Sequence, residues 1–338
     1  GDVTMEVTTH RAEAYVSDSR KPVVRFSTEL VEDLARRDFT VNAMAVDVAD
    51  GTLHDPFGGR ADLMARVLRT PLDPVESFSD DPLRMLRAAR FLSRYGLAPA
   101  DGLVDAARSL VDRMDIVSAE RIRDELFRLL QVEDPTAGFA LLDDMGLLAV
   151  VLPEVAALTR LDREALERRV VAADPVDAVF RLGLLAHGAA GRESLARWKT
   201  ALRLSGRDAG RIGDLLDGAS MLSAWASDGA PSDEQVRRLA ARVGARLDEV
   251  SAFATLVGTG PDGPALAGAV SRLRDMGELD DLGPGMDGAM VMRLLGLEAG
   301  PLVGEVMAWL GELRLTGGRL DDAEVRRRLL DRWGTDRD

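Results

Sequence analysis

The chain has 338 residues, of which 46% are hydrophobic and 30% charged, a composition typical of soluble globular proteins with room for two or three domains. It contains no cysteine, which excludes disulfides and thiolate metal sites, and no apolar run approaches the roughly 20 residues of a membrane span, so we expect a cytoplasmic protein without membrane contacts. The formal net charge of −14 argues weakly against nucleic acid as a partner, although local basic stripes can dock RNA on an acidic protein.

Short strands and one helix are expected at the start of the chain. Residues Val3 to Thr8 alternate apolar and polar side chains, as a half-buried strand does, with Glu6 on the polar face. The expected elements are strands at 3–8, 23–26, 45–48 and 66–69, a helix at 27–36 and a turn at 55–59.

From Ser79 onward the pattern is helical almost to the end. Gly96 suits the left-handed residue that follows a helix, and Ser232 with Gln235 predicts a capping box. The expected early helices are 80–95, 103–113, 119–130 and 135–145. The sequence therefore predicts an α+β protein, in which a small sheet is followed by an all-helical body.

Two stretches carry candidate chemistry. In Arg36 to Met44, two arginines, Asp38 and Asn42 could clamp the phosphates and sugar of a nucleotide, or could form a solvated helix end with local salt bridges.

In the second stretch, 80–91, Asp81 and Arg84 would be neighbours on one helix face. A carboxylate beside a guanidinium matches the pairing edge of cytosine and adenine, which offer an amino donor next to a ring-nitrogen acceptor, and mismatches uracil and guanine. The alternative is an ordinary helix salt bridge.

These two stretches, together with further segments that follow in the same order along the chain, resemble motifs of the class II nucleotidyltransferases. This family comprises bacterial CCA-adding enzymes, their CC- and A-adding relatives and bacterial poly(A) polymerases. The resemblance is strong over residues 1–153, fair over about 284–333 and weak between them. The segments that carry it are 6–11, 36–44, 55–59 with Asp62-Leu63, 81–84 with Arg87, Arg90 and Phe91, and Ala119-Glu120-Arg121-Ile122, and near the end Asp287-Gly288, 295–297 and 300–304.

The resemblance implies a partial head domain of the DNA polymerase beta superfamily at 1–74, a helical neck at 75–153 and a helical, tRNA-binding body and tail at 154–338. It implies CTP and ATP as substrates and Mg²⁺ as cofactor, with two metal ions driving attack of the RNA 3′-hydroxyl on the α-phosphate. Asp81 and Arg84 would select the base. The other implied nucleotide-binding residues are Arg36, Arg37, Asp38, Asn42, Arg87 and Arg90.

The sequence departs from the family pattern where the metals should bind. The Gly-Gly turn and the Asp-x-Asp pair of the head do not precede Glu6, which could be an accessory carboxylate or an ordinary strand residue. We therefore expect no main metal site in this chain and no catalysis by the chain alone. Leu184 to Gly188 resembles an HD motif with glycine in place of the metal-binding aspartate, so His187 is interpreted as a helix residue, and His10 and His54 have no partners at ligand spacing.

Three functions remain open: CCA addition, a sister activity (A-addition, CC-addition or poly(A) synthesis), and a non-catalytic RNA- or nucleotide-binding remnant. In the tail, Arg326, Arg327 and Arg328 either contact tRNA phosphates or form a solvated helix face. The oligomeric state is not predicted by the sequence.

Overall fold

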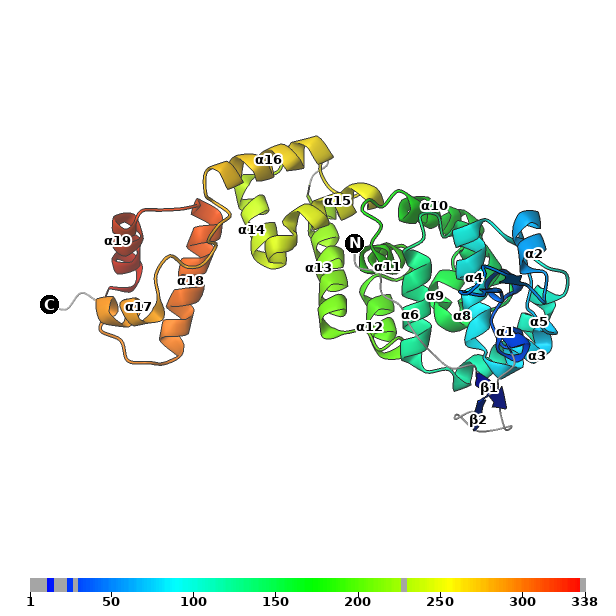
Figure 1. The fold of residues 1–338 in the computed structure, drawn as a ribbon. Coiled ribbons are helices and arrows are strands. Elements are labelled where there is room, and N and C mark those ends of the chain that lie inside the picture. Colours follow the sequence, from blue (N-terminus) through cyan, green and yellow to red (C-terminus); the bar gives the residue numbers. More distant parts are fainter. Residues whose placement is uncertain (1–10, 15–22, 27–29, 226–229, 335–338) are drawn as a thin grey trace. The chain divides into compact units, whose positions relative to one another are not determined.

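The computed structural model describes residues 11–14, 23–26, 30–225 and 230–334 (Figure 1). The chain divides into two compact units, residues 1–209 and 210–338, each of which is described separately. The described residues are mostly helical with a few short strands, as the predicted α+β class requires. Within them, no helix is both long enough and apolar enough to cross a membrane.

The first unit opens with the only strands among the described residues. β1 pairs antiparallel with β2, with Arg11 opposite Phe26, β3 pairs antiparallel with β4, and β5 pairs parallel with β6. The strands predicted at 23–26, 45–48 and 66–69 are confirmed, the last two in shorter form, whereas 3–8 lies outside the described residues. The elements are β1 (Arg11–Ala14), β2 (Val23–Phe26), α1 (Leu30–Ala35), η1 (Thr40–Asn42), β3 (Ala45–Val46), β4 (Leu53–His54), α2 (Gly59–Ala65), β5 (Val67–Leu68) and β6 (Ala98–Pro99).

The predicted turn at 55–59 leads directly into α2. The start of α2 packs closely against η1. The Asp55 carboxylate accepts hydrogen bonds from the main-chain N–H groups of Gly59 (2.6 Å) and Arg60 (2.9 Å), which caps the start of the helix. A Cβ at Gly59 would lie 2.0 Å from the carbonyl oxygen of Thr40, so only glycine permits this approach. The Thr40 hydroxyl in turn donates to Asp62 at 2.7 Å. These contacts fix the end of the turn that carries Asp38 and Asn42.

The predicted helix at 80–95 is wrong at its start. Asp81 has an extended backbone (φ −141°, ψ 98°) and separates two helices, because the residue before a proline is driven out of the helical region. Asp81 therefore does not share a helix face with Arg84. Gly96 ends the helix in the left-handed conformation, as predicted. The helices of this part are α3 (Pro74–Asp80), α4 (Leu83–Tyr95), α5 (Leu103–Ser109), the 3₁₀ helix η2 (Val111–Ile116), α6 (Ala119–Leu130) and α7 (Thr136–Asp144).

α4 packs between α6 and α7 in the first unit. Gly138 in α7 allows close approach, since a Cβ there would lie 2.8 Å from the Ala89 carbonyl oxygen of α4. Arg181, which is fully buried, donates to the main-chain carbonyls of Leu130, Val132 and Glu133 and so closes the C-terminal end of α6. The remaining helices of the unit are α8 (Leu148–Val151), α9 (Pro153–Ala156), α10 (Arg160–Val171), α11 (Ala178–Gly188) and α12 (Arg192–Ala201).

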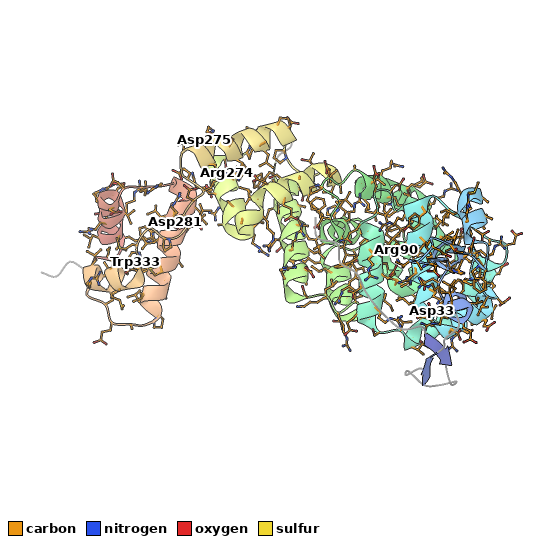
Figure 2. The ribbon with its side chains drawn as sticks, viewed as in Figure 1. Asp33, Arg90, Arg274, Asp275, Asp281 and Trp333 are labelled. Atoms are coloured by element: carbon orange, nitrogen blue, oxygen red, sulfur yellow. The ribbon has the colours of Figure 1, made fainter. Side chains whose placement is uncertain are left out.

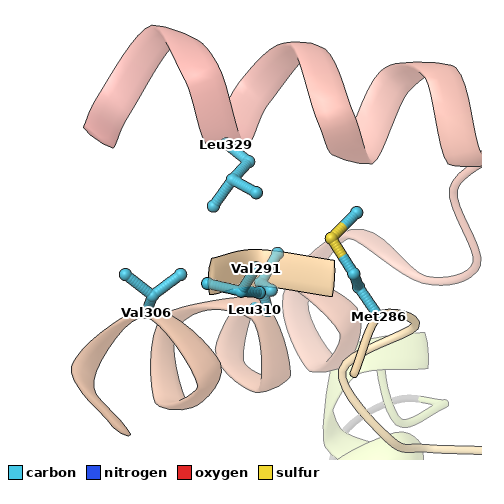
Figure 3. Packing of buried hydrophobic residues seen from close by; sticks show 5 residues of the cluster. All are labelled: Met286, Val291, Val306, Leu310 and Leu329. Atoms are coloured by element: carbon cyan, nitrogen blue, oxygen red, sulfur yellow. The ribbon is translucent and has the colours of Figure 1, made fainter. Parts of the chain in front are cut away.

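The second unit is helical throughout its described residues. The predicted capping box is confirmed, because Ser232 accepts from the Gln235 N–H and the Gln235 side chain accepts from the Ser232 N–H. Figure 3 shows the core of the last three helices, formed by Met286, Val291, Val306, Leu310 and Leu329. The helices are α13 (Gly206–Ser223), whose first four residues belong to the first unit, α14 (Asp233–Val243), η3 (Gly244–Arg246), α15 (Leu247–Val257), α16 (Gly263–Asp275), α17 (Gly288–Leu295), α18 (Pro301–Gly317) and α19 (Asp322–Trp333).

Candidate nucleotide-binding site

The turn between α1 and η1 carries the first group of predicted site residues. Arg36 and Arg37 both bond the carboxylate of Asp33, a residue of α1 labelled in Figure 2, at 2.8 and 3.5 Å. Local salt bridges, one of the two interpretations of this stretch, are therefore present. The two side chains are 29% and 48% exposed, so a ligand could still reach them.

Asp38 is the junction between this turn and α4. Its carboxylate oxygen Oδ2 accepts from Arg87 Nε at 2.7 Å and from Asn42 Nδ2 at 3.5 Å. Asn42 Oδ1 accepts from the main-chain N–H of Phe39 at 3.0 Å, which holds the turn. Two predicted residues that are 49 positions apart, Asp38 and Arg87, are thus in direct contact.

Arg84 also links the two stretches, from a buried position. Its Nη1 donates to the carbonyl oxygen (3.1 Å) and hydroxyl (2.9 Å) of Ser77, and its Nη2 donates to the carbonyl oxygen of Arg36. Its Nε lies 3.8 Å from Asp38 Oδ1 and, among the described residues, has no hydrogen-bond acceptor. A guanidinium has about five N–H groups. Three of them are used here and Nε–H is buried inside the protein, so one Nη2–H remains for an acceptor on a ligand.

Asp81 is held by residues other than Arg84. Its Oδ1 accepts from the main-chain N–H of Leu83 at 3.1 Å, at the start of α4, and its Oδ2 accepts from Arg121 Nη2 at 2.7 Å. The alternative interpretation, a salt bridge between Asp81 and Arg84 along one helix, is therefore not observed. Beside it, burial raises the pKa of the Asp80 carboxyl, against the opposing charges of Arg84 and Arg113.

A buried carboxylate on α6, that of Glu125, supports the second half of α4. The Glu125 side chain is 1% exposed and bonds Nε of Arg90, while Arg128 Nη1 lies at 3.3 Å and Arg87 Nη1 at 3.9 Å. Arg90 is labelled in Figure 2. The Arg90 guanidinium also stacks over the Phe91 ring, 4.7 Å from its centroid. Arg90 is thus engaged within the protein, and Arg87 joins Glu125 to Asp38.

Neither Arg121 nor Glu125 was among the predicted site residues. The available signal for Glu125 was an acidic residue among the buried leucines of an amphipathic helix, because Leu126, Leu129 and Leu130 are buried with it. For Arg121 the signal was weaker. A basic residue in the first turn of a helix opposes the helix dipole, which suggests a partner elsewhere in the fold.

No three histidine, aspartate or glutamate side chains gather as metal ligands within the described residues. The described part of the chain therefore does not by itself supply the ligands of a two-metal centre. Glu6 and His10 lie outside the described residues. His187 lies in the last turn of α11, and burial, followed by the charge of Arg169, lowers its pKa.

The triple arginine lies on α19 in the second unit. Arg327 and Arg328 both bond Glu324 at 2.7 Å, and hydrogen bonds from these two arginines lower the Glu324 pKa to about 2. Glu324 is therefore ionised at neutral pH and offsets part of their charge, whereas Arg326 is exposed to solvent.

Two segments match models of known domain families. Residues 1–69 match the poly A polymerase head domain, and residues 96–159 match a domain described as a probable RNA and SrmB-binding site of polymerase A.

Curated relatives match part of the chain. The chain is 45% identical over 138 residues to the multifunctional CCA protein of Chromobacterium violaceum, covering 40% of this chain and 33% of that protein. It is 36% identical over 203 residues to the CCA-adding enzyme of Anoxybacillus flavithermus, covering 60% of this chain and 50% of that enzyme. The chain thus spans one third to one half of the length of these relatives.

Solved structures match over more of the chain. The CCA-adding enzyme of Bacillus stearothermophilus in complex with CTP superposes with a TM-score of 0.73 at 27% identity, covering 91% of this chain and 76% of that one. The Thermotoga maritima CCA-adding enzyme complexed with tRNA has a TM-score of 0.58 at 21% identity, covers 98% of this chain and 81% of that one, and shows the fold alone.

Proposed function

Because the chain belongs to the family of class II tRNA nucleotidyltransferases and bacterial poly(A) polymerases, we propose that its gene product adds CCA to the 3′ ends of tRNA, using CTP and ATP. We also propose that this gene product acts in the cytoplasm. The curated relatives named above are CCA proteins, and one solved relative holds CTP.

One observation supports the proposal: the two candidate stretches are in direct contact. Arg87 bonds Asp38, and Arg84 bonds the carbonyl oxygen of Arg36, across 49 and 48 residues. A nucleotide site needs cations for phosphates and matched polar groups for the base, and both kinds of side chain meet here. Arg84 is buried, and the described residues accept from only three of its N–H groups, which is unfavourable unless another group accepts from the rest.

Base selection is proposed for Asp81 and Arg84. An ionised carboxylate has roughly four lone-pair sites, of which the Leu83 N–H and Arg121 use two, so Asp81 retains acceptors for an amino group. Arg84 retains one Nη2–H donor for a ring nitrogen. The two side chains act from separate backbone segments, which meet at the start of α4, and together they match cytosine and adenine. We further propose that Arg36, Arg37, Asp38, Asn42, Arg87 and Arg90 line or support the nucleotide site.

We propose Mg²⁺ as the cofactor of the gene product, where it would supply charge stabilisation for the transferred phosphate. Glu6 is proposed as an accessory carboxylate. The described residues contribute the binding and orientation of the nucleotide.

Poly(A) synthesis is the second candidate, because the model matched by residues 1–69 describes a poly(A) polymerase head. The test is incubation of the gene product with Mg²⁺, tRNA lacking its 3′ CCA, and labelled CTP or ATP in separate reactions. CCA addition requires labelling by CTP of this tRNA, whereas poly(A) synthesis gives long labelled tails with ATP alone. Binding of tRNA without labelling by either nucleotide would refute both and favour an RNA-binding remnant.

tRNA docking on the tail gives a separate prediction. If Arg326, Arg327 and Arg328 contact tRNA phosphates, replacing all three with glutamine should weaken binding and lower the slope of log Kd against log salt by about 1–2, because each phosphate contact releases counterions. We expect the smaller end of this range, because Glu324 already engages two of the three.

The matched variant is Glu324→Gln, which removes the acid and frees Arg327 and Arg328. It should strengthen tRNA binding and steepen the salt dependence, measured by filter binding over a salt series. If both variants bind tRNA with wild-type affinity, α19 is not part of the tRNA-binding surface.

A further inference from the structure

Arg121 reaches from the first turn of α6 to a carboxylate 40 residues earlier in the chain. Its Nη2 donates to Asp81 Oδ2 at 2.7 Å, while Asp81 Oδ1 is fixed by the N–H of Leu83 at 3.1 Å. Each oxygen of Asp81 thus has one defined donor, from two different elements. Together these bonds restrict rotation of the carboxylate about both of its side-chain torsions.

The position of Arg121 within α6 does not explain why a basic residue stands there. The N–H of Arg121 is bonded to Ser118, the cap of α6, at 3.4 Å, so the side chain lies at the positive end of the helix dipole, where cations are disfavoured. Arg123, two residues further on, bonds its neighbour Asp124 and the carbonyl oxygen of Arg203. Within the described residues, Arg121 but not Arg123 contacts Asp81.

We infer that Arg121 is a positioning residue for base selection: it orients the Asp81 carboxylate so that its remaining acceptors face the amino group of cytosine or adenine. The inference rests on the proposed function. Arg121 itself does not contact the nucleotide, and it acts through Asp81. A carboxylate free to rotate would accept from the amino group less well and would penalise the carbonyl oxygen of uracil or guanine less strongly.

The exposure of Arg121 and Asp81 allows a positioning role to be distinguished from a purely structural one. The Arg121 side chain is 52% exposed and that of Asp81 22%, and ion pairs of this kind contribute little to folding stability. Loss of Arg121 should therefore leave the melting temperature nearly unchanged while altering the choice of nucleotide.

The test is a set of variants of the gene product: Arg121→Gln, Arg121→Lys, Asp81→Ala and the double variant, with Arg123→Gln as a control from the same helix. The readouts are the ratios of kcat/KM for CTP against UTP and for ATP against GTP, with the melting temperature of each variant. Arg121→Gln should lower both ratios about three- to tenfold. Arg121→Lys should restore part of the loss because it retains one charged donor, and Arg123→Gln should match wild type.

The double variant tests whether Arg121 acts through Asp81. If it does, adding Arg121→Gln to Asp81→Ala should change neither ratio further, because the residue to be positioned is absent. An additional loss of kcat/KM for CTP in the double variant would mean that Arg121 acts on a ligand directly, which would overturn the inference.

The outcomes distinguish this inference from the proposed function. Absence of nucleotide incorporation by the wild type would reject the proposed function itself. An active wild type, with altered ratios in Asp81→Ala but wild-type ratios in Arg121→Gln, would reject only the role of Arg121. Wild-type ratios in Asp81→Ala would reject the base-selecting role of Asp81, and the role of Arg121 with it.

Discussion

Asp81→Ala is expected to raise incorporation of UTP relative to CTP about tenfold or more in the gene product that carries this chain. A well-placed hydrogen-bonding pair contributes about 1–3 kcal/mol of discrimination between bases, and alanine leaves nothing to penalise the carbonyl oxygen of uracil. Arg84, which is bonded by Ser77 and Arg36 rather than by Asp81, should keep its position in this variant. The measurement is kcat/KM for each nucleotide with tRNA lacking its 3′ end.

Two further variants serve as comparisons for Asp81→Ala. Asp81→Asn keeps the shape of the side chain but adds a donor that can face the uracil oxygen, so it should accept UTP at least as well as Asp81→Ala does. Asp105→Asn replaces an acid on α5 whose side chain is 82% exposed, and it should behave as wild type. A CTP:UTP ratio unaltered by Asp81→Ala would exclude Asp81 from base selection.

Glu125→Gln is expected to cause the largest loss of stability. Breaking a buried ion pair costs about 3–5 kcal/mol, and we expect the lower end because Arg128 and Arg87 are 59% and 26% exposed and can be solvated. Arg90, only 12% exposed, would lose its charged partner in a buried position. The change should appear as a lower urea midpoint for the first unit. Trp198, which is buried in this unit, can report it in a background where the other three tryptophans are phenylalanine.

Glu120→Gln on the same helix is the matched control. Glu120 pairs with Arg203 at the surface, so its loss should leave the urea midpoint near that of wild type. If Glu125→Gln unfolds at the same urea concentration as Glu120→Gln, the buried cluster around Glu125 does not hold α6 against α4.

Local patterns predicted most of the described elements. The helix at 119–130, the strand at 23–26, the capping box at Ser232 and the C-terminal glycine of α4 follow from side chains within a few residues of each other. The break before α4 was also encoded locally, in the residue before Pro82, but the helical periodicity on both sides concealed it. The domain boundaries predicted at 74/75 and 153/154 stay a prediction.

The contacts of the predicted site residues were not foreseen from the sequence. Arg84 was expected beside Asp81, because three residues along a helix are neighbours. In the structure its donors reach Ser77 and Arg36 instead, and Asp81 is bonded by Arg121. Such contacts depend on how α1, α3, α4 and α6 pack, and sequence spacing within one helix does not contain that information.

The central claim is tested most directly by sequencing the 3′ ends that the wild-type gene product makes when tRNA lacking its last three nucleotides is supplied with Mg²⁺ and all four nucleoside triphosphates at equal concentration. The account predicts that C, C and A are added in this order and that U and G are rare at every position, because one site offers an acceptor at Asp81 and a donor at Arg84. Ends with runs of A, ends that contain U or G as often as C, or unextended tRNA would contradict it.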